Sequence, residues 1–372
     1  MPAHPPRLEN HTGYGALPRR RRTVALVYYA ETIKALADSP NAPAAAPPVD
    51  LPAAPPVDLS SDAPLSALHD ALDTWFQTNA RDLPWRAPEC TPWGVLVSES
   101  MLQQTPVVRV LPVWEEWLRR WPEPADLARE PAGEAVRAWG RLGYPRRALR
   151  LHAAAGAIGV NHGGKVPGTY PELLELPGVG SYTAAAVAAF AFGRRETVVD
   201  TNIRRVHARL FSGAALPSPA LTAAEMRLAA QALPDDSGPS VRWNASVMEL
   251  GALVCTARSP KCGECPVSGS CAWLAAGEPP PTYTPKGQSW HGTDRQVRGA
   301  VMAVLRAAES PVAAELFQRA PADLGFEPAG IGIPLAALHR LNCAPEQLER
   351  ALAGLLSDGL AELHPAGFRL PA

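Results

Sequence analysis

The sequence predicts an all-α protein whose helices lead into a metal-binding loop. From Leu65 onward apolar residues recur at helical spacing, so that Leu65, Leu68 and Leu72 would share one face of a first helix. Proline and glycine separate each such segment from the next, and alternating runs of β-branched residues are scarce. Four of the six cysteines lie between residues 255 and 271, a clustering that chance does not explain.

The composition allows a sizeable core. The chain has 372 residues, of which 47% are hydrophobic, enough for two or three domains. Its formal net charge of −1 gives no overall basic field, although a local patch is sufficient to bind nucleic acid. No apolar run approaches the length of a membrane span, and the segment after the Arg run at 19–22 is too weakly apolar for a secretory signal. We therefore expect a cytoplasmic protein with no membrane partner.

Residues 1–63 are expected to be a disordered leader. The hexapeptide AlaProProValAspLeu occurs at 46–51 and again at 54–59, within Ala- and Pro-rich sequence that cannot bury a core. The Arg run at 19–22 is either a solvated tail or a nonspecific nucleic-acid contact, and the tail is the simpler interpretation.

Residues 64–278 form the predicted helical core. After the first helix, amphipathic segments follow at 95–104, 106–121, 132–141, 146–160, 181–192, 201–211, 222–232 and 241–254.

A linker at 279–291 separates this core from a C-terminal module, residues 292–372. The module is predicted to contain helices at 294–308, 311–319 and 345–358, with an irregular stretch before the last helix, and a short hairpin over 360–370. Three helices that end in a hairpin predict a winged-helix-like fold.

The clustered cysteines are separated by six, two and five residues: Cys255, Cys262, Cys265 and Cys271. Thiolates gathered this tightly select an iron–sulfur cluster or zinc. Zinc ribbons usually bring together two closely spaced pairs, whereas only Cys262 and Cys265 form such a pair, so we favour one [4Fe–4S] cluster held by one loop. A disulfide knot is disfavoured because no secretory signal is present. The isolated Cys90 and Cys343 are interpreted as small apolar residues.

A second motif is LeuProGlyValGlySerTyrThr at 176–183. Gly178 and Gly180 flank an apolar residue just before a helix expected to begin near Ser181. Glycine allows a tight turn, and the start of a helix leaves amides free to hold a phosphate. The pattern is that of a helix-hairpin-helix, which binds the DNA backbone without reading its sequence. A plain glycine-containing turn between two helices would give the same pattern.

Asp200 follows two apolar residues and opens the helix that carries Arg204, Arg205 and Arg209. A carboxylate in this place would be held ionised by the helix dipole. An Asp at a helix start is usually only a cap. Its position soon after a phosphate-binding hairpin favours a catalytic role.

These motifs together resemble the DNA glycosylase superfamily of endonuclease III. Three further segments resemble the MutY-type adenine DNA glycosylases: AspLeuProTrpArg at 82–86, GluSerMetLeuGlnGlnThrProVal at 99–107 and ArgLeuGlyTyrProArgArgAlaLeu at 141–149. The resemblance covers about residues 64–275 and leaves the leader and the tail outside it. It implies a six-helix subdomain at 94–199, and a cluster subdomain built from 64–93 and 200–278.

The resemblance implies a monomer that excises adenine mispaired with 8-oxoguanine or guanine in double-stranded DNA. The base must be flipped out of the stack, and its departure needs one protonated carboxyl and one ionised carboxylate. Glu99 lies in an apolar context that would raise its pKa, and would act as general acid toward adenine N7. Asp200 would stabilise the oxocarbenium-like sugar or trap it covalently.

Position 182 distinguishes two branches of the superfamily. Bifunctional members have a lysine there that forms a Schiff base, so Tyr182 implies a monofunctional enzyme that uses water. Tyr182 and Asn202 would hold Asp200 and the water. Gln104 and Tyr144 match residues that enter the duplex around 8-oxoguanine, although Tyr144 as simple packing at a helix end is the alternative.

The resemblance implies that the adenine pocket is walled by Arg81, Leu83, Trp85 and Arg86. The pattern of the hairpin itself predicts contacts to the DNA backbone from Gly178, Gly180 and Ser181, and the basic residues of the cysteine loop, Arg258 and Lys261, could add contacts to phosphate.

The chain also departs from the family pattern. Pro145 stands where a second tyrosine is common, and Ala245 where a Glu or Gln would contact adenine. Many MutY-type proteins end in a hydrolase-like α/β domain that recognises 8-oxoguanine, and residues 290–372 are too short and too helical for one. The Arg-bearing stretch 292–299 offers DNA contacts instead.

Two other functions fit part of the pattern. A thymine or uracil mismatch glycosylase shares the motifs, but Glu99 argues against it because a pyrimidine needs no acid at N7. A DNA-binding iron–sulfur module without catalysis would be favoured only if Glu99 or Asp200 were missing.

Overall fold

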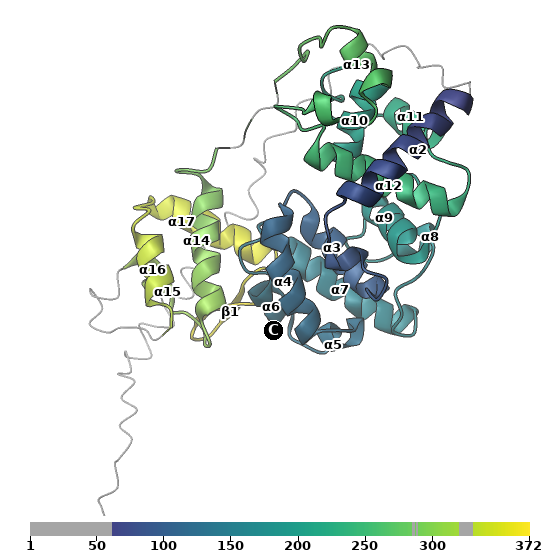
Figure 1. Cartoon of the computed structure of the whole chain (residues 1–372). Coiled ribbons are helices and arrows are strands. Elements are labelled where there is room, and N and C mark those ends of the chain that lie inside the picture. The colour runs from purple at the N-terminus through teal and green to yellow at the C-terminus, as the bar shows by residue number, and fades with distance from the viewer. Residues whose placement is uncertain (1–61, 285–286, 288, 320–329) are drawn as a thin grey trace, which may run out of the picture. The chain divides into compact units, whose positions relative to one another are not determined.

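The computed structural model describes residues 62–284, 287, 289–319 and 330–372 (Figure 1). The expected leader therefore lies almost entirely outside the described residues. The chain divides into two compact units, with the boundary between residues 288 and 289. No helix in the described part of the chain is both long enough and apolar enough to cross a membrane.

The first unit consists of helices joined by turns. Its α-helices are α2 (Asp62–Asn79), α3 (Pro92–Leu102), α4 (Val107–Arg120), α5 (Pro124–Ala128), α6 (Ala132–Ala138), α7 (Arg146–Asn161), α8 (Tyr170–Leu174), α9 (Ser181–Phe192), α10 (Thr201–Leu210), α11 (Ala223–Gln231), α12 (Ser237–Leu253) and α13 (Ala272–Ala275). Its 3₁₀ turns are η1 (Pro84–Arg86), η2 (Cys262–Glu264) and η3 (Ser268–Ser270). All the core helices expected from periodicity are present.

Two details of the core differ from the prediction. Helix α5 was not expected, because a single turn is too short to show a period; it is set by Pro124 at its start and by reciprocal bonds between Glu123 and Asp126. Helix α12 begins at Ser237, earlier than the predicted residue 241. Pro239 lies in its first turn, where a helix needs no backbone donor, so the proline that suggested a break is accommodated.

Helix α9 lies at the centre of the unit. Its residues from Thr183 to Ala189 are all buried, and most are alanine, so neighbouring helices approach closely. It packs against α3 and α8, while α12 packs against both α2 and α10. The shared core contains Leu72, Ala186, Ile203 and Leu250. Figure 1 shows α2 and α10–α13 gathered at one end of the unit and α3–α7 at the other.

The second unit contains α14 (Asp294–Ala307), α15 (Ala314–Gln318), α16 (Gly332–His339), α17 (Pro345–Ser357), β1 (Glu362–His364) and β2 (Gly367–Arg369). The predicted hairpin is confirmed: β1 and β2 pair antiparallel, with Leu363 opposite Phe368. An isolated bridge joins Val312 to Phe368. Helix α16 replaces part of the expected irregular stretch, and it packs on α14.

The hairpin between α8 and α9 depends on one of its two glycines for its shape. Gly178 has a φ of 78°, and a Cβ atom there would lie 2.4 Å from the Cβ of Arg150 on α7. Gly180 is the extended N-cap of α9, and a Cβ atom there would meet nothing within 4 Å. The turn therefore requires glycine at 178 and tolerates alanine at 180.

We expect Gly178→Ala to destabilise the protein by at least about 2 kcal/mol, because the left-handed backbone and the contact with Arg150 both oppose a side chain. Gly180→Ala, the matched control in the same turn, should cost less than about 1 kcal/mol. Thermal denaturation of the three proteins measures the difference, and equal midpoints for both variants would contradict this explanation of the turn.

Candidate active site and cluster loop

A cavity of about 870 Å³ opens in the first unit. It brings together nine of the predicted site residues from η1, α3, α9, α10 and the connecting segments: Arg81, Leu83, Trp85, Arg86, Glu99, Gln104, Tyr182, Asp200 and Asn202. Ala245 of α12 also lines it, with a methyl group where a polar contact was expected from the family pattern. The volume is that of a pocket for a small organic group such as a nucleobase.

Glu99 lies near the end of α3 and is only 5% exposed. Its Oε2 accepts a hydrogen bond of 2.8 Å from the hydroxyl of Tyr182. Burial raises the pKa of Glu99 to about 7, and the Tyr182 hydroxyl and the Arg86 charge only partly oppose this rise. The carboxyl is therefore able to carry a proton near neutral pH.

Asp200 is both the cap of a helix and part of the cavity. Its Oδ1 accepts from the backbone N–H of Ile203 at 2.6 Å, and its Oδ2 accepts from the Asn202 amide at 2.8 Å. Burial raises its pKa, which the helix dipole alone would have lowered, while these donors and Arg205 oppose the rise. Its ionised form is thus favoured mainly by specific donors, and this corrects the expectation that the helix start is sufficient.

A chain of hydrogen bonds connects Asp200 to the cysteine loop. Asn202, which donates to Asp200, accepts from Arg205 Nη2 at 2.8 Å. Arg205 also donates to the carbonyl of Gly251 at 2.7 Å and, through Nε, to that of Cys255 at 2.8 Å. The backbone of the first cysteine and Asn202, the donor to Asp200, are therefore held by the same guanidinium.

The wall of the cavity holds a cluster that the sequence did not reveal. Glu249 of α12 is fully buried and accepts hydrogen bonds from both Arg81 and Arg86. Beside them Leu83 is buried, and Trp85 meets Trp114 edge to face at 5.6 Å. One feature of the sequence could have indicated this cluster. Glu249 is the single acidic residue within the apolar run ValMetGluLeuGly, and a buried carboxylate without a partner would destabilise the fold, so a buried partner was to be expected.

Gln104 and Tyr144 lie on two exposed turns with left-handed backbone, at φ 55° and 47°. Buried Arg147 joins the turns: its guanidinium donates to the carbonyls of Gln103 at 2.7 Å and Gly143 at 3.2 Å. Tyr144 remains 48% exposed, which fits a surface contact better than packing at a helix end. The sequence analysis did not identify Arg147 or predict that it would bridge the two turns.

The remaining predicted contacts lie away from the cavity. Gly178, Gly180 and Ser181 are exposed at the hairpin that leads into α9. Arg258 and Lys261 are exposed on the cysteine loop, where Lys261 forms an ion pair of 3.5 Å with Glu264.

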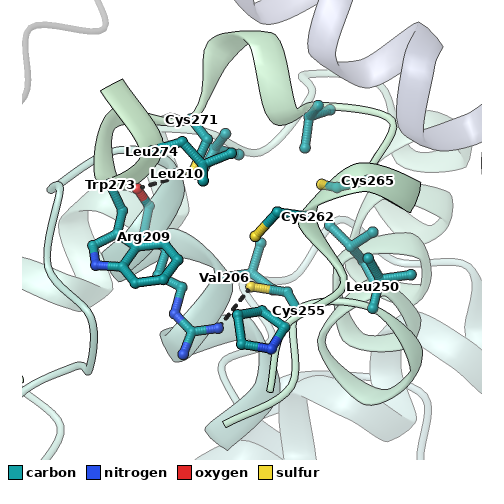
Figure 2. A pocket seen from close by; sticks show the side chains of 13 residues that line it. Val206, Arg209, Leu210, Leu250, Cys255, Cys262, Cys265, Cys271, Trp273 and Leu274 are labelled. Carbon is teal, nitrogen blue, oxygen red and sulfur yellow. Dashed lines mark hydrogen bonds between the residues drawn. The ribbon is translucent and has the colours of Figure 1, made fainter. Parts of the chain in front are cut away.

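The four clustered cysteines are free thiols that line one small apolar cavity, shown in Figure 2. Within the described residues, no three Cys, His, Asp or Glu side chains gather closely enough for a single metal ion. Thiols that surround a space in this way fit a cluster with iron at several corners better than one zinc ion. Arg209 donates to Cys255 Sγ at 3.4 Å and to the Thr256 carbonyl at 2.8 Å, so a positive charge lies beside the thiolate set.

Comparison with known proteins gives a family match for the segment that contains most of the cavity residues and another for the cysteine loop. Residues 97–231 match the HhH-GPD superfamily of base excision DNA repair proteins, and residues 255–271 match the iron–sulfur binding domain of endonuclease III. The adenine DNA glycosylase of Mycobacterium tuberculosis (strain CDC 1551 / Oshkosh) is 46% identical over 80% of this chain and 91% of its own length. The chain belongs to the adenine DNA glycosylase family. It carries the iron–sulfur cluster site of that family in Cys255, Cys262, Cys265 and Cys271.

More distant relatives match the glycosylase core. Human adenine DNA glycosylase is 39% identical over 56% of this chain and 39% of its own length. The structure of a thermostable thymine-DNA glycosylase matches 58% of this chain and 98% of its own, with 29% identity and a TM-score of 0.52. A non-covalent endonuclease III–DNA complex matches 58% of this chain at 22% identity and a TM-score of 0.50, which shows the shared fold.

We expect the purified protein to be yellow-brown and to contain about four iron atoms per chain. Cys265→Ser should lower the iron content and the visible absorbance, because it removes one of the four ligands. Cys343→Ser, a thiol of the second unit, is the matched control and should leave both unchanged. Stoichiometric zinc in a colourless protein would refute the cluster.

Glu99→Gln should stabilise the folded protein at alkaline pH. A carboxyl whose pKa is raised on folding from 4.5 to about 7 contributes stability below pH 4.5, and this contribution is lost as the pH rises through 7. The shift corresponds to about 3 kcal/mol, so the melting temperature of the variant relative to the wild type should be several degrees higher at pH 8 than at pH 5. The same change at exposed Glu115 should give a difference that is independent of pH over this range.

Proposed function

We propose that this protein is a monofunctional DNA glycosylase of base-excision repair, which hydrolyses the N-glycosidic bond of adenine mispaired with 8-oxoguanine or guanine. The observation that carries the proposal is a pair of carboxyl groups, buried Glu99 and partly exposed Asp200, on one cavity large enough to admit a nucleobase. The names of the mycobacterial and human relatives support adenine as the excised base.

Glu99 supplies the proton that adenine needs to leave. With its Oε2 bonded to the Tyr182 hydroxyl, Oε1 is left to present a proton to N7 of a flipped adenine. Protonation turns the purine into a better leaving group, since the electrons of the breaking bond are then received by a cationic base, which departs as neutral adenine.

Asp200 supplies the negative charge that the sugar needs as the bond breaks. Its two oxygens are fixed by Ile203 and Asn202, so it does not have to reorganise when an oxocarbenium-like sugar forms. Water then completes hydrolysis on the sugar. None of the residues that line the cavity is a lysine, so no Schiff base forms and the strand is left intact.

The DNA is held by surfaces around the cavity. The amides at the start of α9 receive a backbone phosphate, and the Gln104 and Tyr144 turns enter the duplex beside the mispair. Among the structural relatives that share this fold is an endonuclease III–DNA complex, which supports DNA as the partner. The enzyme acts as a monomer on cytoplasmic DNA. When bound, the cluster orders the loop that carries Arg258 and Lys261.

A thymine mismatch glycosylase is the second candidate. The thymine-DNA glycosylase of Aeropyrum pernix is 34% identical over 56% of this chain and 95% of its own length. Glu99 favours adenine, because a proton delivered to N7 assists only a purine.

The test is single-turnover cleavage of three duplexes, which carry A opposite 8-oxoguanine, A opposite G, and T opposite G. We expect adenine release from the first two, with strand scission only after alkali. Glu99→Gln should lower the rate by at least about 100-fold, while Glu115→Gln should not change it. Activity on T opposite G alone would assign the thymine branch, and scission without alkali would exclude a monofunctional enzyme.

A further inference from the structure

Glu249 is a fully buried carboxylate that the proposed mechanism does not use. It lies on α12, and its side chain is 0% exposed. Its Oε1 accepts from the backbone N–H of Arg81 at 2.9 Å and from Arg81 Nε at 2.7 Å. Its Oε2 accepts from Arg81 Nη2 and Arg86 Nη2, each at 2.8 Å. Such a forked arrangement fixes the orientation of a guanidinium as well as its position.

Both arginines face the cavity that contains Glu99. Arg81 and Arg86 line it, and the Arg86 charge is near enough to Glu99 to lower its pKa. Arg86 also lies over the ring of Phe76 at 5.4 Å, so its guanidinium is held from two sides. With Glu249 ionised, the three side chains carry one net positive charge instead of two.

We propose that Glu249 is a positioning residue for adenine excision: it fixes Arg81 and Arg86 as one wall of the base pocket and cancels one of their two charges, so that Glu99 keeps its proton. This role rests on the proposed function of the cavity. Ala245, on the same helix, presents only a methyl group to the pocket, so the polar character of this wall comes from the two arginines.

Few charged groups face Glu99, so the effect of the Arg86–Glu249 pair on its protonation can be separated from the others. Tyr182 of α9 donates to it, Asp200 at the start of α10 repels its ionised form, and Arg86 of η1 attracts that form. Arg147 of α7 meets α3 through the carbonyls of Ser100 and Met101.

On α4, the helix that packs on the other side of α3, Arg109 donates to the carbonyl of Arg141. Arg86 is thus the positive charge that acts on Glu99, and Glu249 is the carboxylate paired with it.

The decisive experiment compares pH–rate profiles for single-turnover adenine release by the wild type and Glu249→Gln. The wild-type rate should fall as the pH rises through about 7, where Glu99 loses its proton. In the variant the uncompensated Arg81 and Arg86 favour ionised Glu99, so this descending limb should move down by roughly one pH unit. At pH 8 the variant should then be roughly 100-fold slower than its own low-pH plateau, against roughly 10-fold for the wild type.

Two further variants separate charge from structure. The double change Arg81→Gln with Glu249→Gln restores one net positive charge and should move the limb back toward its wild-type position. Glu134→Gln is the matched control, because Glu134 also bridges two arginines, Arg120 at 2.8 Å and Arg137 at 3.0 Å, outside the cavity. It should leave the limb in place.

If Glu249→Gln does not fold, as judged by the loss of cluster absorbance, Glu249→Asp gives the answer. Aspartate keeps the charge but is shorter, so the limb should stay in place while the plateau rate falls because the two guanidiniums are no longer held together. A limb that does not move in Glu249→Gln, or that moves in Glu249→Asp, would overturn the role of Glu249. A wild type that releases no adenine would instead count against the proposed function itself.

Discussion

The site depends on one constraint: two carboxyl groups line the same cavity, and their hydrogen-bond partners make them different acids. Glu99 receives a single hydroxyl donor and otherwise faces a desolvated environment, so its pKa rises to about 7. Asp200 receives an amide and a backbone N–H, which partly offset the rise in its pKa that desolvation causes. The environment, and not the chemical type of the residue, therefore divides the roles of acid and anion between them.

The packing of the helices fixes the positions of Glu99 and Asp200 relative to each other. Glu99 lies on α3 and Tyr182 on α9, two helices that pack closely because the buried stretch of α9, residues 183–189, is mostly alanine. Asp200 caps α10, which packs on α12, and α12 ends at Leu253, two residues before the first cysteine of the loop. Through Arg205 the backbone of Cys255 is bonded to Asn202, so the order of the loop bears directly on the position of the anion.

The sequence was most informative where a motif is local. The cysteine spacing, the glycine hairpin and the cap at Asp200 each depend on residues close together in the chain, and each lies where it was expected. What sequence could not supply is pairing over long separations. Glu249 meets Arg81 across 168 residues, and Arg147 meets Gln103 across 44, so neither partner is visible in the local pattern. Short helices such as α5 and α16 were missed because one or two turns give too little periodicity to measure.

The hydrogen bonds of Arg147 also explain how Gln104 and Tyr144 are held in an unfavourable backbone conformation at the surface. Left-handed backbone costs a residue such as Gln104 or Tyr144 about 1–2 kcal/mol. Arg147 donates to carbonyls on both turns from a buried position, and its burial makes each of those bonds expensive to break. The two turns are therefore fixed as a single unit before any duplex arrives. Turns whose backbone is already fixed lose little conformational entropy on binding, so under the proposed function more of the binding free energy would remain for unstacking the target base.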